Sequence, residues 1–354
     1  MSFSISGRHI GENAAPYIIA ELSGNHNGEL GRAFALMEAA CAAGADAIKI
    51  QTYTADTLTL DCDKPDFVIH GGLWDGRTLH ELYQEAHTPW DWHPALFSKA
   101  RELGITLFST PFDFTAVEFL ESLDAPAYKI ASFENIDLPL IERVAATGKP
   151  MIISTGMANA EEIGEAVAAA RKGGCTELCL LHCISGYPTP PEVSNIRTLV
   201  DLRERFGVVT GLSDHTLSTA TAVAAVALGA SVVEKHITLA RADSGPDAAF
   251  SLEPQEFRKL VEECRIANAA LGVVTYAQAE CEKPNMVFRR SLYAVADIAE
   301  GEQLTHLNVR SIRPGYGLPP KLLPAILGQR AVCSILRGTA LRIDMVRNID
   351  EERD

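Results

Sequence analysis

The sequence predicts an α/β fold: a TIM (β/α)8 barrel followed by a small β-rich domain. Short β-branched apolar runs alternate with longer Ala-rich stretches of helical spacing as far as about residue 270. Eight such β–α units in a stretch of this length are typical of a TIM barrel. The alternation stops after Leu271, where the smaller domain is expected to follow. A doubly wound open sheet is the alternative, because strand periodicity alone does not exclude it.

The apolar runs predict eight strands with helices between them. Two of the intervening segments, Ala160–Lys172 and Ser218–Leu228, carry the apolar spacing of a helix. The strands are expected at Tyr17–Glu21, Ala45–Gln51, Thr106–Thr110, Ala127–Ala131, Met151–Thr155, Leu178–Cys183, Val208–Ser213 and Ser231–His236.

A long loop follows the second predicted strand, roughly from Thr52 to Trp92. It contains all three tryptophans and a Gly-rich turn at Gly71–Gly76. Long loops in compact domains are usually functional or disordered, and this aromatic content argues against disorder. Two interpretations stay open, a lid or substrate wall and simple packing on the surface.

The end of the chain predicts a linker and a second domain. The stretch Thr275–Asn285 is polar and ends at a Lys-Pro turn, which is typical of a linker. Strand-like runs at Ser291–Val295 and Ala331–Ser334, separated by Gly and Pro turns, indicate a β-rich domain. The predicted boundaries are 1–273 for the barrel, 274–287 for the linker and 288–354 for the β-rich domain.

Composition excludes several classes of partner. The chain has 354 residues, 47% of them hydrophobic, and a net charge of -15, so it is repelled by nucleic acid and by anionic membranes. It has no apolar run long enough to span a bilayer, and Met1–Ile10 lacks the apolar core of a signal peptide. We therefore expect a cytoplasmic protein whose eight cysteines are free thiols, mostly buried.

Polar residues end every predicted strand. In a TIM barrel the active site lies at the C-terminal ends of the strands. One such residue alone is more often a helix cap or a structural group, but burying so many on one barrel face requires partners. The residues are Glu21, Lys49, Gln51, Ser109, Thr110, Lys129, Ser132, Glu134, Ser154, His182, Ser185, Tyr187, Ser213, Asp214, His215, Glu234, Lys235 and His236.

Lysines at three of these strand ends are unusual in an acidic chain. Lys49, Lys129 and Lys235 either form internal ion pairs with nearby glutamates or line a pocket for an anion. The serine and threonine hydroxyls around them favour a small ligand that carries both a phosphate and a carboxylate.

Two histidines close the last two predicted strands. His215 and His236 can share a divalent metal and leave positions open for water and substrate. Asp214 is a possible supporting partner for this pair. Glu21 is the best carboxylate for managing a water molecule or a proton.

The sequence resembles the sialic acid synthase family, and the matching motifs run through the whole chain. Many members of this family carry an asparagine where Ser185 stands, a departure that bears on sugar binding. The motifs lie at Ile19–Gly28, Lys49–Thr52, Ser109–Asp113, Tyr128–Ser132, Ser154–Met157, Gly211–Thr216, Glu234–His236, Gly245–Asp247 and Arg310–Gly315.

The resemblance implies a TIM barrel with a C-terminal domain similar to type III antifreeze protein, a SAF-like domain, in a domain-swapped homodimer. It implies catalytic roles for Glu21, His215 and His236, with the two histidines holding Mn²⁺ or Mg²⁺, possibly Co²⁺. Phosphoenolpyruvate would be bound by Lys49, Thr110, Lys129, Ser132, Ser154, Ser185 and Ser213. The sugar would meet Gln51, Glu134, Tyr187, Asp247 and Arg313.

Within the family the pseudaminic acid synthase branch is the most similar. Leu22-Ser23, the loop segments Gly72–Gly76 and Thr88–His93, and His182–Tyr187 indicate that branch. It implies condensation of phosphoenolpyruvate with 2,4-diacetamido-2,4,6-trideoxy-L-altrose, with formation of a C–C bond and cleavage of a C–O bond. Synthesis of N-acetylneuraminate or legionaminate is the alternative within the family.

Two other classes of function stay open. A Schiff-base sialic acid aldolase would use Lys49 or Lys129 on free pyruvate and would not need the two histidines. A non-catalytic glycan-binding protein would use the C-terminal domain, but it would leave the polar barrel face unexplained.

Overall fold

The computed structural model describes residues 1–346 and divides the chain into two compact units, Met1–Gly272 and Val273–Asp354. The last residues of the predicted C-terminal domain, 347–354, lie outside the described residues. Within residues 1–346, no helix combines the length and the apolar character that crossing a bilayer requires.

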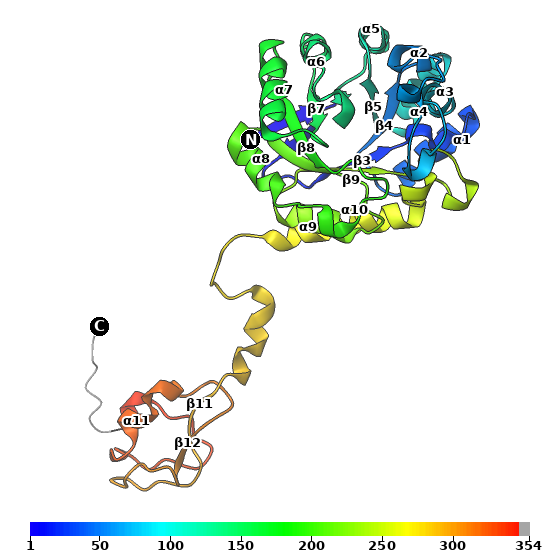
Figure 1. Ribbon diagram of the computed structural model, residues 1–354. Helices are drawn as coiled ribbons and strands as arrows, with labels where there is room; N and C mark the ends of the chain where they lie inside the picture. The colour runs from blue at the N-terminus through cyan, green and yellow to red at the C-terminus, as the bar shows by residue number, and fades with distance from the viewer. Residues whose placement is uncertain (347–354) are drawn as a thin grey trace. The chain divides into compact units, whose positions relative to one another are not determined.

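The first unit is a closed barrel of parallel strands, which confirms the TIM barrel and excludes the open sheet (Figure 1). The ring closes where β10 pairs with β3, with Val232 opposite Tyr17 and His236 opposite Glu21. Each predicted strand is present, with ends that match or differ by at most two residues. The strands are β3 (Tyr17–Glu21), β4 (Ala47–Thr52), β5 (Thr106–Pro111), β6 (Tyr128–Ile130), β7 (Met151–Ser154), β8 (Leu178–Cys183), β9 (Val209–Asp214) and β10 (Val232–His236).

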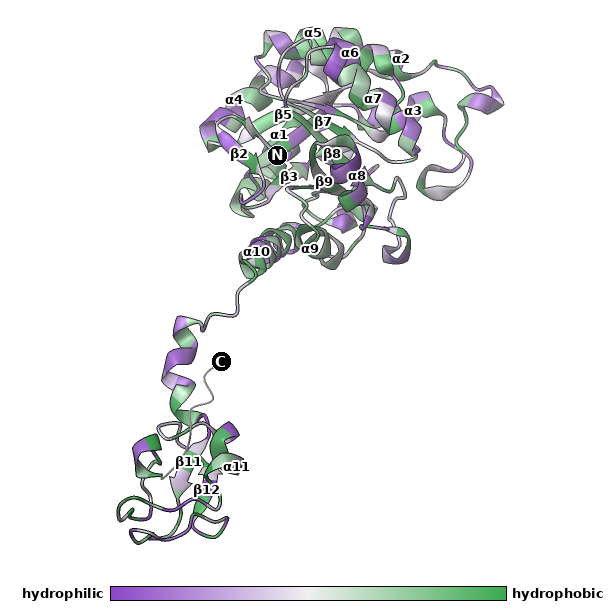
Figure 2. Cartoon of the chain, turned by 90° about the vertical axis from the view of Figure 1, so that its left-hand side faces the viewer, coloured by the Kyte–Doolittle hydropathy of each residue, from purple (hydrophilic) through white to green (hydrophobic). Residues whose placement is uncertain are grey.

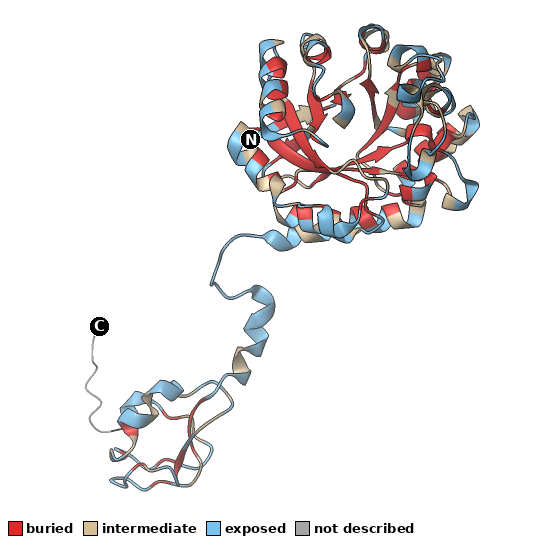
Figure 3. Cartoon of the chain, in the orientation of Figure 1, coloured by how far each residue is buried: buried red, intermediate tan, exposed pale blue. Residues whose placement is uncertain are grey.

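Helices surround the barrel and bury the outward-facing side chains of its strands. Figure 3 shows the strands buried and the helices exposed on their outer faces. Hydrophobic and hydrophilic colours both appear along α10 in Figure 2, and its buried face contains Phe257, Leu260 and Val261. The helices are α1 (Leu30–Ala42), α4 (His93–Leu103), α5 (Phe114–Ser122), α6 (Leu138–Ala145), α7 (Ala160–Lys172), α8 (Thr198–Phe206), α9 (Ala220–Ala227) and α10 (Pro254–Leu271).

An N-terminal hairpin that we did not predict closes one end of the barrel. It consists of β1 (Ser2–Ile5) and β2 (Arg8–Gly11), which pair antiparallel. Its apolar residues Phe3, Ile5 and Ile10 pack with the inward-facing side chains of the barrel strands, including Tyr17 at the start of β3. The hairpin therefore covers the N-terminal ends of the strands and leaves the C-terminal ends for the site.

The long loop after β4 is ordered. It contains α2 (Ala55–Leu58), α3 (Leu79–Ala86) and short 3₁₀ helices. The indole nitrogen of Trp74 donates to the carbonyl of Pro246 at 3.1 Å, on a loop at the C-terminal ends of the strands. Trp90 instead stacks on Phe119 of α5 with ring centroids 4.7 Å apart. The loop therefore combines a wall at the strand ends with packing against the outer helices.

The second unit is a small β domain with its own core. Strands β11 (Ser291–Ala294) and β12 (Val309–Ile312) pair antiparallel, and α11 (Leu323–Ile326) packs on the same core. The strand predicted at Ala331–Ser334 is wrong, because Ala331 makes only an isolated bridge to Val346. The predicted linker also contains structure, since an exposed 3₁₀ helix spans Glu280–Phe288.

Candidate active site

A cavity of about 370 Å³ lies at the C-terminal ends of the barrel strands. Most of the predicted site residues line it. They are Lys49, Gln51, Lys129, Ser132, Glu134, Ser154, Tyr187, Ser213, His215, His236 and Asp247. Glu21, Thr110 and Ser185 do not line the cavity. Glu21 and Thr110 nevertheless contact Lys49, which does line it. Arg313 belongs to the second unit.

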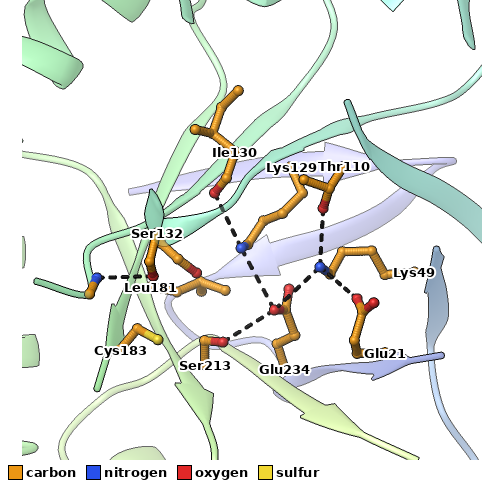
Figure 4. A network of polar contacts seen from close by, with 12 residues as sticks. Glu21, Lys49, Thr110, Lys129, Ile130, Ser132, Leu181, Cys183, Ser213 and Glu234 are labelled. Carbon is orange, nitrogen blue, oxygen red and sulfur yellow. Dashed lines mark hydrogen bonds and ion pairs between the residues drawn. The ribbon is translucent and has the colours of Figure 1, made fainter. Parts of the chain in front are cut away.

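Lys49 is the centre of a buried polar network (Figure 4). Its Nζ lies 2.5 Å from Glu21 Oε2 and 3.6 Å from Glu234 Oε1, and it donates to Thr110 Oγ1 at 3.1 Å. Burial alone would lower the pKa of Lys49, but Glu21 and Glu234 outweigh burial and raise it. Burial raises the pKa of Glu21 in spite of Lys49. Lys49 therefore stays charged, while Glu21 is able to take up a proton.

Glu234 connects Lys49 to the second lysine of the cavity. Its Oε1 lies 3.7 Å from Lys129 Nζ and accepts a hydrogen bond from Ser213 Oγ at 3.2 Å. Burial opposes charge on Glu234, but Lys129 and Lys49 outweigh burial and lower its pKa. Glu234 offsets part of the charge of the two lysines, and when Glu21 is protonated one positive charge is left at this end of the cavity to attract an anion.

The hydroxyls of Ser132 and Ser185 converge beside Gly156, just after β7. The Gly156 N–H donates to Ser132 Oγ at 3.1 Å, and a Cβ at this position would collide with Ser132 and Ser185. The buried Ser154 Oγ has no hydrogen-bond partner within residues 1–346. Hydroxyl groups gathered beside a backbone N–H at the end of β7 suit the oxygens of a phosphate group.

The two histidines lie next to each other at the ends of the neighbouring strands β9 and β10, with ring centroids 5.4 Å apart. His215 Nδ1 donates to the carbonyl of Ile184 at 3.0 Å, which leaves its Nε2 lone pair available. His236 Nδ1 is buried with no partner in the part of the chain that the structure describes. Burial, followed by the charge of His215, lowers the pKa of His236 well below its usual value, so its imidazole is neutral.

The neutral imidazole of His236, with its unpartnered Nδ1, fits a divalent metal. Burial would lower the pKa of His215, but Cys183 outweighs burial and raises it, so this imidazole offers Nε2 to a metal only in its neutral form. No group of three His, Cys, Asp or Glu side chains in residues 1–346 is arranged to hold one. A metal at His215 and His236 would therefore complete its coordination with water or substrate, which agrees with the open positions expected of such a site.

Three predicted polar residues point away from the cavity, because side chains alternate between the two faces of a strand. Lys235 Nζ lies 2.7 Å from Asp214 Oδ2, and both are buried outside the barrel lumen. Lys235 is therefore not part of an anion pocket, and Asp214 pairs with Lys235 instead of supporting the histidines. His182 likewise has a structural role, as its Nε2 donates to Ser194 O at 2.7 Å.

Other cavity residues are suited to a sugar. Asp247 Oδ2 accepts hydrogen bonds from Ser23 Oγ and, at 3.1 Å, from the Gly24 N–H. Burial raises the pKa of Glu134 to about 7, and its Oε2 has no partner among the described residues. The Tyr187 ring lies 4.6 Å from that of His215.

The sequence did not predict most of the apolar side chains that line the cavity. The tryptophans of the long loop were the available signal, and Trp74 does line the cavity, with its ring 5.8 Å from that of Tyr187. Cys183 was predicted only as a buried thiol, yet it also lines the cavity, 3.8 Å from His215 Nδ1. The other apolar lining residues include Tyr53, Leu58, Ile69, Leu79, Leu82, Tyr83, Phe112, Phe133 and Phe250.

Known proteins share both the sequence and the fold. The sequence pattern of the NeuB family matches residues 36–276, more than half of the chain. The chain belongs to the NeuB family. A SAF domain matches residues 289–347 of this NeuB-family chain, which confirms the predicted kind of C-terminal domain.

Two curated relatives of this NeuB-family chain are similar along almost their whole length. The pseudaminic acid synthase of Campylobacter jejuni is 47% identical over 92% of this chain and 95% of its own. The pseudaminic acid synthase of Helicobacter pylori is 43% identical over 93% of this chain and 97% of its own. The N,N'-diacetyllegionaminic acid synthase of Legionella pneumophila is more distant, with 34% identity over 94% of each chain.

Solved structures agree with the fold. The spore coat polysaccharide biosynthesis protein SpsE of Bacillus subtilis has a TM-score of 0.67 and 33% identity, covering 99% of this chain and 100% of its own. The N-acetylneuraminic acid synthetase of Leptospira borgpetersenii has a TM-score of 0.72 and 29% identity, covering 81% of this chain and 95% of its own.

Proposed function

We propose that this chain is a pseudaminic acid synthase. It condenses phosphoenolpyruvate with 2,4-diacetamido-2,4,6-trideoxy-L-altrose and releases pseudaminic acid and phosphate. Relatives of this name are 43–47% identical to the chain. Synthesis of N-acetylneuraminate or legionaminate is the alternative. It would bind phosphoenolpyruvate at the same lysines and serines of the cavity.

The observation that carries the proposal is the division of the cavity into two chemically different ends. The inner end has Lys49, Lys129 and the serine hydroxyls. The outer wall is apolar, with side chains such as Leu79 and Trp74, and within residues 1–346 no arginine and no further lysine lines the cavity. The C6 methyl and acetamido groups of a trideoxy sugar suit this wall, whereas a sugar phosphate would leave its charge unpaired.

The inner end binds and orients phosphoenolpyruvate. Lys49 and Lys129 balance its negative charges, and the cavity-lining hydroxyls of Ser132 and Ser154 take the phosphate oxygens, with Ser185 close behind them at Gly156. C3 of phosphoenolpyruvate attacks the aldehyde carbon of the open-chain sugar, and a C–C bond forms. Water adds to C2, where positive character has developed, and the tetrahedral intermediate then loses phosphate by C–O cleavage. The lysines act through charge and hydrogen bonds, and neither forms a covalent bond.

Glu21 takes the proton of the attacking water. Its raised pKa and its contact with the ammonium of Lys49 allow it to accept a proton and return it. Gln51 Nε2 donates to Glu21 Oε1 at 3.3 Å, which connects the buried carboxylate to the cavity wall. Thr110 keeps Lys49 oriented between Glu21 and the anion.

The proposed metal site consists of His215 and His236, and it would hold Mn²⁺ or Mg²⁺, possibly Co²⁺. When bound, the metal supplies a positive charge that polarises the aldehyde oxygen of the sugar. The carbonyl of Ile184 fixes the tautomer of His215 for this task. Chelation should abolish activity and added Mn²⁺ restore it, whereas full activity in chelator would contradict the metal site.

Beyond the single chain, we propose a domain-swapped homodimer in which Arg313 of one subunit serves the barrel of the other. The proposed partners of the protein are its small-molecule substrates and a second copy of the chain. We propose no binding to nucleic acid or to a membrane. The cytoplasmic location stays a prediction from the sequence.

A panel of acceptors tests the proposed function. The purified protein is incubated with phosphoenolpyruvate and Mn²⁺, and phosphate release and the sugar product are measured with each acceptor. We expect kcat/KM for the trideoxy-altrose to exceed that for N-acetylmannosamine and N-acetylmannosamine 6-phosphate by at least about a hundredfold. A preference for another acceptor would reassign the chain within the family. Trapping of pyruvate by borohydride would instead indicate an aldolase.

A further inference from the structure

Ser23 adopts a backbone conformation that serine normally avoids. Its φ is 45°, in the left-handed region, where the Cβ of an L-residue crowds the backbone and glycine is free of that cost. The nearby Asn27 has a φ of 50°, but asparagine tolerates this region well. Ser23 is also buried, with 6% of its surface exposed, and it lines the cavity. A residue kept in an unfavourable conformation at a buried site indicates a task for its hydroxyl.

The hydroxyl of Ser23 joins side chains from two other strand ends. Its Oγ donates to Asp247 Oδ2, on the loop after β10, and accepts from Gln51 Nε2 on β4 at 3.1 Å. The Ser23 N–H also donates to Glu21 Oε1 at 2.9 Å, but any residue at this position would provide that bond. Within residues 1–346, the hydrogen bonds of the hydroxyl are those to Gln51 and Asp247.

Gln51 and Asp247 both line the cavity beside Ser23. Both hydrogen bonds that Asp247 accepts from Ser23 and Gly24 use Oδ2, which leaves Oδ1 for a hydroxyl of a substrate. The phosphate-binding serines lie at the ends of other strands, so this cluster faces a different part of the substrate pair. The geometry of Gln51 and Asp247 is set by the Ser23 hydroxyl, which a glycine at this position would lack.

We propose that Ser23 is a positioning residue that holds Gln51 and Asp247 in the geometry that binds the acceptor sugar. The proposal rests on the proposed function, because it assigns this side of the cavity to the sugar. Ser23 acts through its two neighbours and does not take part in the chemical step. The Ser23 hydroxyl thus fixes the sugar site, although the backbone of Ser23 is strained.

Two substitutions separate the hydroxyl from the strain. Ser23→Gly removes both, and Ser23→Ala removes the hydroxyl but keeps the Cβ in the left-handed region. For both variants we expect the acceptor KM to rise by about tenfold or more, as for loss of a hydrogen bond to a charged group. The KM for phosphoenolpyruvate should stay within about twofold of wild type. Ser23→Gly should melt no lower than Ser23→Ala, because it relieves the strain.

Ser6→Gly is the matched control. Ser6 has a φ of 47° in the exposed turn between β1 and β2, at the opposite end of the barrel. This variant relieves the same backbone strain, and both Michaelis constants should stay at wild-type values. It therefore separates effects of backbone relief from effects of the lost hydroxyl at the sugar site.

The outcomes that would overturn the proposal are distinct. An unchanged acceptor KM in Ser23→Gly, with the wild type active, would overturn the role of Ser23 and leave the proposed function standing. Equal increases in the two Michaelis constants would overturn it as well, since they would indicate a general loss of structure. A wild-type protein that is inactive on every acceptor would overturn the proposed function, and the role of Ser23 with it.

Discussion

Glu134 is a cavity carboxyl that titrates near neutral pH. Burial raises its pKa from 4.5 to about 7. The folded state therefore favours the protonated carboxyl, and its contribution to stability is complete below pH 4.5 and is lost as the pH rises through about 7.

Glu134→Gln should remove this pH dependence. Glutamine has the shape of the protonated acid and cannot ionise. Without substrate or metal, the variant should gain stability over wild type between pH 5 and pH 8, by at most about 3 kcal/mol because Glu134 is partly exposed. Urea unfolding at both pH values measures the difference. Glu165→Gln, on the exposed face of α7, is the control, and a pH-independent difference for Glu134→Gln would contradict the assignment.

At the residue scale, the sequence predicted the site where strand alternation could be read from the chain. Lys49 and Gln51 are two residues apart on β4, and both reach the cavity. Lys235 forms an internal ion pair, one of its two predicted roles, but with Asp214 and not with a glutamate. It does not reach the anion pocket because its neighbours Glu234 and His236 occupy the inward positions of β10. Whether a side chain at a strand end points into the barrel depends on the register of the strands, and a sequence motif does not reveal that register.

At the scale of elements, the N-terminal hairpin forms the closed end of the barrel. Its four-residue strands are too short for alternation to distinguish them from a loop, so the sequence did not predict it. The barrel strands were predictable because they are apolar runs flanked by helices. The wall formed by the long loop was not, because its apolar residues are scattered between short turns and become one surface only in the fold.

The hairpin should contribute stability without contributing to the site. Ile10 is fully buried among inward-facing residues of the barrel. We expect Ile10→Ala to lower the free energy of unfolding by about 2–5 kcal/mol, the cost of truncating a core side chain. Ile266→Ala, on the exposed side of α10, should cost far less. Urea unfolding measures the stability of each variant, and both Michaelis constants are measured where the protein is folded. A change in the acceptor KM of the folded Ile10→Ala variant would contradict the separation of the hairpin from the site.

For the whole molecule, Arg313 tests whether two chains share one active site. It is exposed in a turn that is fixed within its own unit, where Ser291 Oγ donates to Pro314 O at 2.7 Å. A guanidinium can bond an amide oxygen of the sugar in a geometry that lysine lacks. Arg313→Ala should therefore raise the acceptor KM much more than that of phosphoenolpyruvate. Arg310→Ala, also exposed on β12, is the control.

Mixed dimers decide whether the arginine acts across subunits. Arg313→Ala and His215→Ala subunits are each defective, but a hybrid has one site with both residues intact. We expect freshly exchanged mixtures to recover part of the wild-type activity. Inactive hybrids, or active isolated monomers, would contradict the trans-acting arginine.

The most direct test of the central claim is the fate of the bridging oxygen of phosphoenolpyruvate. Phosphoenolpyruvate labelled with ¹⁸O at this position is incubated with the trideoxy-altrose acceptor and the enzyme, and both products are analysed by mass spectrometry. A synthase that cleaves the C–O bond transfers the label to inorganic phosphate and leaves pseudaminic acid unlabelled at C2, and this is the result we predict. Label retained in the sugar, or no consumption of phosphoenolpyruvate, would contradict it.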